Sequence, residues 1–415
     1  MKKGFLLLSF LMGLAFPSFA QNTSSPYTRY GYGSLVDAGA GLSKSMGGVS
    51  LGLRPKKFIN PGNPASYTAV DSMTFRFELG VEAKISTYSD KAANQTTFDA
   101  NLSYMAMQFP ITRWLGVSAG LLPYSYVGYD FYQSEEQPST MTNGSLKARY
   151  DYKGEGGVSQ AYFGLGISPF KNMSIGANFV YNFGDIEHSS DVSFSTAAFR
   201  SMYQKKKISV SDFNWTAGAQ YEIGLEDEKS LTVGVIFEPK SKMNVNAAQE
   251  IYVSDVDTVN IDNEDGFETP MMVGVGVVYG ISERMNFGID YKRQNWSDVE
   301  FFGEKKFVDR NKVAAGAEML PNNSSKRYFE RVHYRLGLSY SNSYYKMNGS
   351  QLDEYSFSAG MGFPLKKGMN PTVINFSFEY GNMGAASGNK VREQYCKFTL
   401  GATINERWFA KRKIE

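Results

Sequence analysis

The sequence predicts an all-β fold: a closed antiparallel barrel of 14 strands that crosses a membrane. Three observations lead to this prediction. Residues 1–20 have the charged, apolar and small-residue layout of a signal peptide, so the protein leaves the cytoplasm. No later apolar run approaches the roughly 18 to 20 residues that a spanning helix needs. Aromatic residues make up 15% of the chain, and alternating segments of strand length recur along it.

The first alternating segment, residues 73–85, sets the pattern. Phe75, Phe77 and Leu79 have one parity, and charged residues have the other. In a barrel the apolar face meets lipid and the polar face meets the lumen. We therefore expect eight charged residues to point inward: Arg76, Glu78, Glu82, Lys84, Asp290, Lys292, Arg335 and Glu379. Buried charges persist only when paired or hydrated, so we expect ion-pair networks; gating or holding a ligand carboxylate is the alternative.

Fourteen candidate strands can be counted along the chain, an even number, as bacterial single-chain barrels require. Short turns are predicted at 110–113, 169–172, 281–284 and 364–371, and long surface loops at 128–157, 184–207, 239–270 and 294–311. The predicted strand cores are 73–85, 98–109, 114–127, 158–168, 172–183, 208–222, 230–238, 271–280, 284–293, 312–320, 332–340, 355–363, 372–380 and 394–404.

Composition excludes several function classes. Cys396 is the only cysteine, so neither a disulfide framework nor a cysteine metal cluster is expected. A net charge of +2 argues against a nucleic-acid partner. Ser50 lies in a G-x-S-x-G stretch, but the strand and helix that make this motif a nucleophile elbow are missing from the pattern. We expect no enzyme activity, no cofactor and no metal site.

Short motifs in the second half of the chain carry a resemblance to a known family. A paired-strand segment ends in Trp-Ser at 296–297, a Gly-Ala-Glu strand follows at 316–318, and an Arg-x-Gly strand follows at 335–337. In this order they resemble the FadL-type outer-membrane transporter family, which carries long-chain fatty acids and other hydrophobic solutes. The segment SPYTRYGYGSL, at 25–35, and the style of the leader are similar to barrels of the Bacteroidota.

The resemblance extends to the N-terminal region, where Asn63-Pro64-Ala65 matches the motif of the family's hatch. It implies an arm and hatch inside the lumen (21–72) and a 14-stranded barrel (73–409). Before and after these the sequence itself predicts the signal peptide (1–20) and a basic periplasmic tail (410–415), and the tail departs from the family pattern. The resemblance also implies a location in the bacterial outer membrane. Expected contacts there are outer-membrane lipids and lipopolysaccharide.

The third predicted strand carries Gly120 and Pro123, and the resemblance implies a lateral gap beside a kink in this strand. Proline cannot donate a ladder hydrogen bond and belongs at bulges or edges. We hypothesise that Asn63-Pro64-Ala65 is a rigid wedge that satisfies the broken strand near Pro123. The alternative is an ordinary Asn-Pro turn that leads out of a disordered arm.

Two functions remain open. The first is passive transport of hydrophobic or amphipathic molecules, with lateral exit near the third strand; it predicts an apolar pocket between loops and hatch. The alternative is a barrel that transports nothing and serves as a subunit or scaffold of an outer-membrane protein assembly or secretion complex, with barrel or lipoprotein partners. FadL-like barrels of the Bacteroidota include such subunits. The basic tail after Trp408-Phe409, where many barrels end on an aromatic residue, favours this alternative modestly.

Overall fold

The structure is a computed structural model. It describes residues 23–89, 94–139, 144–196, 199–253, 259–263, 267–282, 284–347, 349–366, 371–384 and 391–407. The predicted signal peptide (1–20) and basic tail (410–415) lie outside the described residues. No helix in the described part of the chain is long and apolar enough to cross a membrane.

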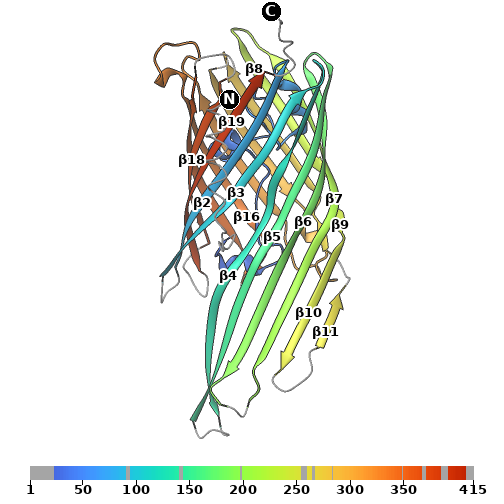
Figure 1. Cartoon of the computed structure of the whole chain (residues 1–415), viewed down its shortest axis with the longest axis vertical. Helices are drawn as coiled ribbons and strands as arrows, with labels where there is room; N and C mark the ends of the chain where they lie inside the picture. Colours follow the sequence, from blue (N-terminus) through green and yellow to red (C-terminus); the bar gives the residue numbers. More distant parts are fainter. Residues whose placement is uncertain are drawn as a thin grey trace, which may run out of the picture.

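Fourteen strands form one closed antiparallel barrel, which confirms the predicted fold class (Figure 1). Each strand pairs with the next, β8 pairs with β13, and β19 pairs with β2 to close the ring. Each predicted strand core overlaps one of them. The strands are β2 (Thr74–Ser89), β3 (Asn94–Pro110), β4 (Leu115–Ser139), β5 (Gly144–Phe170), β6 (Met173–Phe194), β7 (Met202–Gly224), β8 (Lys229–Glu238), β13 (Met272–Ile281), β14 (Met285–Gln294), β15 (Arg310–Met319), β16 (His333–Met347), β17 (Ser350–Pro364), β18 (Val373–Met383) and β19 (Arg392–Arg407).

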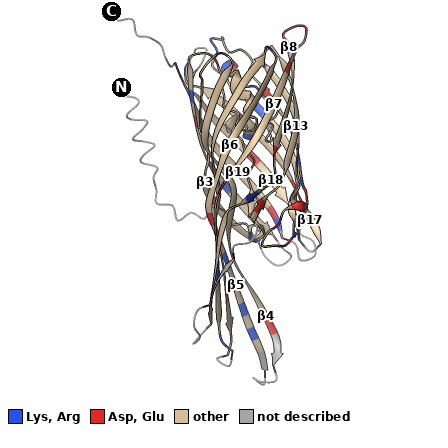
Figure 2. Ribbon diagram, turned by 90° about the vertical axis from the view of Figure 1, so that its right-hand side faces the viewer, with Lys and Arg blue, Asp and Glu red and all other residues tan. Residues whose placement is uncertain are grey.

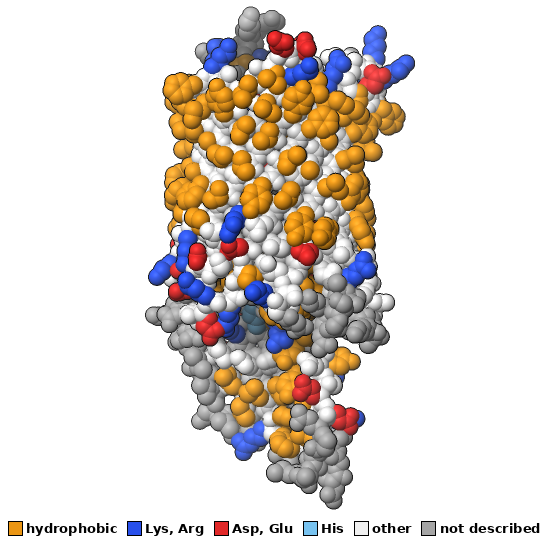
Figure 3. Space-filling model, turned by 180° about the vertical axis from the view of Figure 1, so that it is seen from behind, with side chains coloured by type: hydrophobic (Ala, Val, Ile, Leu, Met, Phe, Trp, Pro, Cys, Tyr) orange, Lys and Arg blue, Asp and Glu red, His pale blue; other side chains and the backbone are white. Residues whose placement is uncertain are grey.

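The period-2 pattern of each strand separates a lumen face from a lipid face. On β16, Arg335 is 2% exposed, whereas its neighbour Leu336 is 55% exposed. Such exposure of apolar side chains is typical of a wall that faces hydrocarbon. Figure 3 shows a broad hydrophobic band across this face of the barrel, with charged side chains near both of its ends.

Four strands are much longer than a membrane requires. β4 to β7 contain 25, 27, 22 and 23 residues, against the roughly 9 to 11 that cross a bilayer. Their distal parts, 126–139, 144–156, 185–194 and 202–210, continue past the barrel (Figure 2). β10 (Val245–Val253) and β11 (Val259–Asn263) widen this sheet, which we call the extension.

The extension corrects the predicted surface loops at 128–157 and 184–207, because most of both segments is paired strand. The connection 239–270 likewise holds β10 and β11, together with β9 (Ser241–Met243) paired to β12 (Phe267–Thr269). Arg149, Asp151, Lys153 and Glu155 share one parity, so they line one solvated face of a strand rather than an irregular loop.

The sheet bends where the extension leaves the barrel. The β4–β5 register shifts between Pro123 and Ser125. At the same level Gly157 of β5 has φ +146° and Gly184 of β6 has φ +147°. A Cβ on Gly184 would collide with the Gly157 carbonyl oxygen, so both position and backbone conformation require glycine.

The extension lies at the end of the barrel opposite the start of β2 and the end of β19. Thr74 at the start of β2 pairs with Arg407 at the end of β19, next to the short turns. Bacterial barrels keep short turns on the periplasmic side and longer segments on the cell surface. The turn between β15 and β16 is longer than the other turns at this end and includes η4 (Phe329–Arg331).

Residues 23–72, which we call the arm, run within the barrel, where Figure 1 shows them in blue. The arm contains η1 (Pro26–Arg29), the short strand β1 (Ser34–Leu35), α2 (Gly41–Ser45) and η2 (Pro64–Ala69). Most of its residues are buried. Regular structure covers little of the arm, so its backbone polar groups need partners on the wall.

Candidate functional site: the arm in the lumen

The Asn63-Pro64-Ala65 motif starts η2 and faces β5 to β8. The Asn63 side chain accepts a hydrogen bond from the Ala65 amide at 3.1 Å and donates one to the Leu51 carbonyl at 2.8 Å. A Cβ on Gly218 of β7 would collide with the Asn63 side-chain oxygen. Glycine at this wall position therefore lets the motif approach the strand closely.

The backbone beside Pro123 finds its partners in another part of the arm, which corrects the wedge hypothesis. Val36 donates its amide to the Tyr124 carbonyl at 2.8 Å. β1 pairs with β4 through Ser34 and Leu35, opposite residues 125–126. The arm does cover the irregular part of the third barrel strand, but it does so about 30 residues before the motif that sequence reasoning selected.

β3 and β4 separate at this level. Their pairing ends at Met105 and Leu121, so Gly120 still lies in the regular ladder. Beyond that point, the Tyr126 hydroxyl donates to the Leu102 carbonyl at 3.1 Å across the separation. Pro123 begins the bulge. The ladder interruption therefore lies between Leu121 and the bulge at Pro123 on β4.

The start of the arm contacts both sides of this interruption. Ser24 donates to the Asp99 carboxylate on β3 at 2.8 Å. Thr28 donates through its hydroxyl to the Gly128 carbonyl on β4 and accepts from the Gly128 amide, at 3.0 and 3.1 Å. Together with β1, these residues form a polar bridge between β3 and β4. Such a bridge is needed where strands in a membrane leave backbone groups unpaired.

The inward charges of β2 hold the middle of the arm. All of these contacts are with arm residues more than 15 positions away in the chain, so they fix a long-range arrangement rather than a local turn. Arg76 donates to the Phe58 carbonyl at 3.0 Å, and Glu78 accepts from the Ile59 amide at 2.8 Å. Glu82 forms an ion pair with Lys44 at 3.1 Å. The fourth, Lys84, pairs instead with Glu393 of β19 at 2.7 Å.

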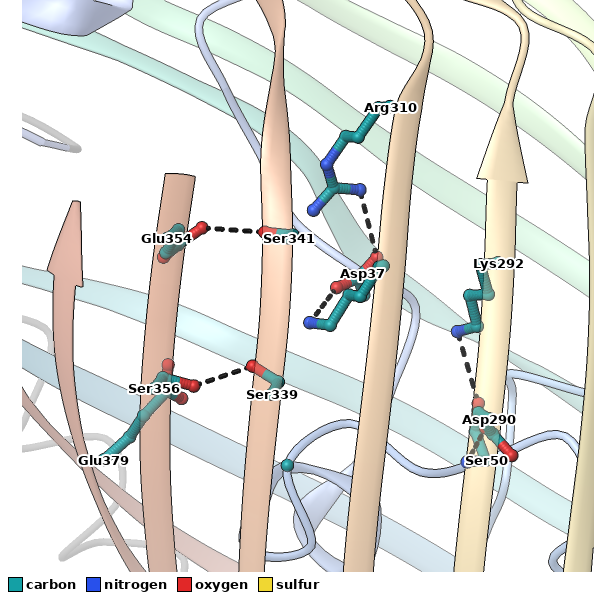
Figure 4. Close-up of polar contacts among 12 residues, drawn as sticks. Asp37, Ser50, Asp290, Lys292, Arg310, Ser339, Ser341, Glu354, Ser356 and Glu379 are labelled. Carbon is teal, nitrogen blue, oxygen red and sulfur yellow. Dashed lines mark hydrogen bonds and ion pairs between the residues drawn. The ribbon is translucent and has the colours of Figure 1, made fainter. Parts of the chain in front are cut away.

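On β14, Asp290 and Lys292 contact the G-x-S-x-G stretch. The Ser50 and Leu51 amides donate to Asp290 at 2.6 and 2.9 Å, and the Lys292 ammonium donates to the Ser50 hydroxyl at 3.3 Å (Figure 4). Ser50 is fully buried. The Asp290 carboxylate holds its amide and the Lys292 ammonium holds its hydroxyl, so Ser50 anchors the arm to β14.

The remaining two predicted charges join networks within the wall. Arg335 donates to Glu318 at 3.0 Å, and Glu318 also lies 3.0 Å from His333. Glu379 accepts from Tyr395 at 2.9 Å and lies 3.4 Å from Lys397. The eight predicted charges therefore all face the lumen, where some contact the arm and others contact neighbouring strands of the wall.

Asp37 is an anchor that sequence reasoning missed. It reaches from the arm to β15, where it lies 2.6 Å from Lys312 and 3.5 Å from Arg310 (Figure 4). Its surroundings in the sequence, VDAGAG, have no alternation and no motif. The inward parity of Arg310 and Lys312 was the available signal for an acidic partner.

An aromatic cluster fills the lumen between the arm and the surface end. The Tyr32 ring of the arm lies 4.9 Å from that of Phe267 and 5.3 Å from that of Trp296. Its hydroxyl donates to the Glu268 carbonyl at 2.6 Å. The aromatic members of the cluster are Tyr27, Tyr32, Tyr124, Tyr129, Phe267, Trp296, Phe307, Tyr344 and Tyr345.

A polar cavity of about 180 Å³ lies beside the arm. It reaches Asn101 and Tyr126 at the interrupted β3–β4 ladder. Pockets for drug-sized ligands usually measure about 300 to 1,000 Å³ and are mostly apolar. Here the lining mixes five carboxylates with five cations: Asp37, Glu82, Glu354, Glu379 and Glu393 with Lys44, Lys84, Arg310, Lys312 and Lys397.

Comparison with solved structures identifies the fold as that of FadL-type channels. The chain is similar to a Pseudomonas aeruginosa FadL homologue (TM-score 0.62, 11% identity, 90% of this chain and 99% of that chain). It is also similar to the Pseudomonas putida toluene transporter TodX (0.58, 14%, 91% and 100%). The Ralstonia pickettii toluene transporter TbuX is a third example (0.55, 14%, 90% and 99%). At these identities the similarity establishes the fold.

No curated protein matches the sequence. The profile of one protein family, BamG, matches residues 1–415, which is the whole chain. A match of this extent assigns the family, and the FadL-type fold is compatible with it. This outer-membrane type of β-barrel is therefore a member of the BamG family.

Proposed function

We propose that this protein resides in the bacterial outer membrane as a barrel closed by its own arm, and that it works as a non-transporting subunit of an outer-membrane protein assembly complex. The observation that carries the proposal is the filling of the lumen. Arm, wall and surface segments meet there in the aromatic cluster, at the place where a transporter of this fold needs an apolar pocket. Fold alone does not fix function.

The way in which the arm is held supports a permanent closure. Its contacts are distributed over β2, β14 and β15, and they use buried charges as well as backbone groups. Opening the lumen would leave these charges without partners, which is costly in a low-dielectric interior. A route that opens for each solute would have to break them in every cycle.

Passive transport is the second candidate, and one specific observation favours it. The β3–β4 ladder is interrupted beyond Leu121, and the polar cavity reaches that point. The related folds include proteins described as toluene transporters. A lateral exit for a hydrophobic or amphipathic molecule would lie here. The bridge formed by Ser24, Thr28 and β1 occupies this path.

Native mass spectrometry of the protein, extracted gently from its own outer membrane, distinguishes the two candidates. We expect a stoichiometric assembly with another barrel or with lipoproteins. A monomer that carries a fatty-acid-sized or aromatic adduct would overturn the subunit proposal and support transport. Lipopolysaccharide adducts are read from the same spectrum, which separates bound lipid from a solute in the lumen.

A further inference from the structure

The strand registers assign a face to every residue of the extension, because directly opposed residues point to the same side of a sheet. Three rows cross it on the side that continues the lumen face of the barrel. We call this side the inner face. The rows are Tyr129, Gly154, His188, Lys206 and Gln249; then Phe131, Tyr152, Ser190, Gln204 and Ile251; then Gln133, Tyr150, Val192, Met202 and Val253.

The opposite side, the outer face, is charged and internally neutralised. Lys205 of β7 pairs with Glu187 of β6 at 2.9 Å, and Lys207 pairs with Asp185 at 3.1 Å. These cross-strand pairs are solvated and satisfy each other. The lysines of the outer face therefore already have counter-charges, and the face also carries the exposed aromatic side chains Tyr132, Tyr203 and Tyr252.

The inner face is aromatic and cationic. The rings of Phe131 and Tyr152 lie 5.4 Å apart, and those of Tyr152 and Tyr150 lie 6.5 Å apart. Arg29 of the arm stacks 3.9 Å over the Tyr152 ring. The three rows contain aromatic, aliphatic, hydroxyl and amide side chains with His188 and Lys206. The next row adds one carboxylate, Glu135, which accepts from the Gln133 amide at 3.1 Å, against the two cations Lys206 and Arg29.

The two cations on this face lack acidic partners among the described residues. The Lys206 ammonium lies 3.3 Å from the Phe302 ring centroid, and neither it nor Arg29 forms an ion pair with a described carboxylate. On the outer face, by contrast, the neighbouring lysine of the same strand is paired. This asymmetry leaves a net positive charge on the inner face.

The position of the extension selects the class of partner. These strand segments lie beyond the length that a bilayer requires, so lipid tails do not cover the inner face. Figure 3, viewed from behind, shows a hollow below the barrel wall with hydrophobic, Lys or Arg, and His side chains around it. Tyr150 and Tyr152 are half-buried on this face, and apolar surface left open to water beyond the bilayer marks an interaction site. Aromatic side chains and arginine are the residues that dominate protein interfaces.

We propose that the inner face of the extension docks a polypeptide segment of a partner protein at the cell surface, and that this segment combines acidic and apolar side chains. The carboxylates of the partner meet Lys206 and Arg29, and its apolar side chains cover Tyr150 and Tyr152. The inference rests on the proposed role as a complex subunit and names the surface through which one partner is held.

The test uses full-length protein in its own cells with a photoreactive phenylalanine analogue at Tyr150 on the inner face or at Tyr203 on the outer face. Both positions are aromatic and lie on the extension, so they form a matched pair. We expect a specific cross-link from position 150 to an acidic segment of another protein, identified by peptide sequencing. Position 203 should give none.

Charge reversal then tests the recognition. Lys206→Glu should reduce the cross-link from position 150 by about tenfold, whereas Lys205→Glu on the opposite face should leave it nearly unchanged. Equal effects of the two variants would overturn the proposal. A cross-link to lipopolysaccharide, or to a second copy of this chain, would also overturn it.

The two proposals fail in different ways. A wild-type protein that is monomeric in the native spectrum contradicts the subunit function itself. A wild-type complex that is intact, with position 150 giving no cross-link to protein, contradicts the docking surface alone. Heat-modifiable migration of the Lys206→Glu barrel on a gel confirms that the variant has folded before its cross-linking is compared.

Discussion

The Asp37 carboxylate lies 2.6 Å from the Lys312 ammonium and joins the arm to β15 of the barrel wall. Burial alone would raise the pKa of Asp37, but the charges of Lys312 and Arg310 lower this pKa well below its usual range. A carboxyl group whose pKa is lower in the folded state stabilises the fold above its unfolded pKa. That contribution is lost only as the pH falls through the lowered value.

Asp37→Asn should destabilise the barrel, because it keeps the size of the side chain but leaves Lys312 and Arg310 without a counter-charge. We expect a loss of about 3 kcal/mol in the free energy of unfolding, measured by urea titration in detergent micelles. The difference from wild type should persist at pH values above about 4 and shrink below.

Asp227→Asn is the matched control for this substitution. Asp227 pairs with Lys229 at 3.2 Å in an exposed turn, where water screens the pair. Its substitution should cost less than about 1 kcal/mol. Equal losses for the two variants would show that Asp37 does not anchor the arm.

Tyr32→Ala should open the aromatic cluster. The side chain is fully buried among Phe267, Trp296 and Phe307, and its removal leaves a cavity at a cost of about 3 to 5 kcal/mol. Tyr32→Phe removes only the hydrogen bond to the Glu268 carbonyl and should cost about 1 kcal/mol. If the cluster closes the lumen, the alanine variant should also conduct ions in planar bilayers.

The control for conductance is Tyr221→Ala, which removes an aromatic side chain that is 52% exposed on the barrel wall. It should leave the wild-type conductance unchanged. If the wild-type protein already conducts as well as Tyr32→Ala, the aromatic cluster does not close the lumen.

Gly184→Ala should loosen the extension without unfolding the barrel. The φ of +147° is outside the range that an alanine adopts readily, and its Cβ would collide with the Gly157 carbonyl. We expect a local cost of at least about 1 to 2 kcal/mol, seen as faster amide hydrogen exchange in the distal parts of β5 and β6. Gly224→Ala, where a Cβ meets nothing within 4 Å, should change neither region.

The sequence was sufficient for the barrel but not for the extension or the path of the arm. Alternation identified every barrel strand, because lipid and lumen impose opposite demands on successive residues of a strand such as β16. In β5 to β7 the outer face is charged. Without knowledge of the strand pairing, so many charged residues are read as a solvated loop. Glu187 and Lys205 become interpretable only once their register is seen.

For a related reason, the sequence predicted only part of the candidate site. Inward parity placed Asp290 and Glu82 in the lumen, because parity is a local property. Whether Val36 or Ala65 lies beside the β4 bulge depends on the path of the arm. Val36 and its partner Tyr124 are about 90 residues apart in the sequence. No spacing rule encodes that path. The sequence therefore indicated the rigid Asn-Pro turn for the contact with the β4 bulge, whereas β1 makes it.

His188 gives the extension a predicted pH dependence. Burial, followed by the charges of Lys206 and Arg29, lowers the pKa of His188 to about 4, and its ring lies 2.7 Å from the Tyr129 hydroxyl. Because the pKa is lower in the folded state, protonation favours local unfolding. The stability of the extension should therefore be complete above about pH 6.5 and decrease as the pH falls towards about 4.

Hydrogen exchange, corrected for the intrinsic pH dependence of amides, measures this effect separately in the extension and in the barrel wall. Wild type should lose protection at the distal part of β6 below about pH 6, while β13 and β14 stay protected. His188→Gln keeps a neutral polar side chain beside Tyr129. In this variant the protection of the distal part of β6 should be the same above and below about pH 6. If the glutamine variant loses protection over the same range as wild type, another group is responsible, and the unpaired cations around His188 do not control the extension.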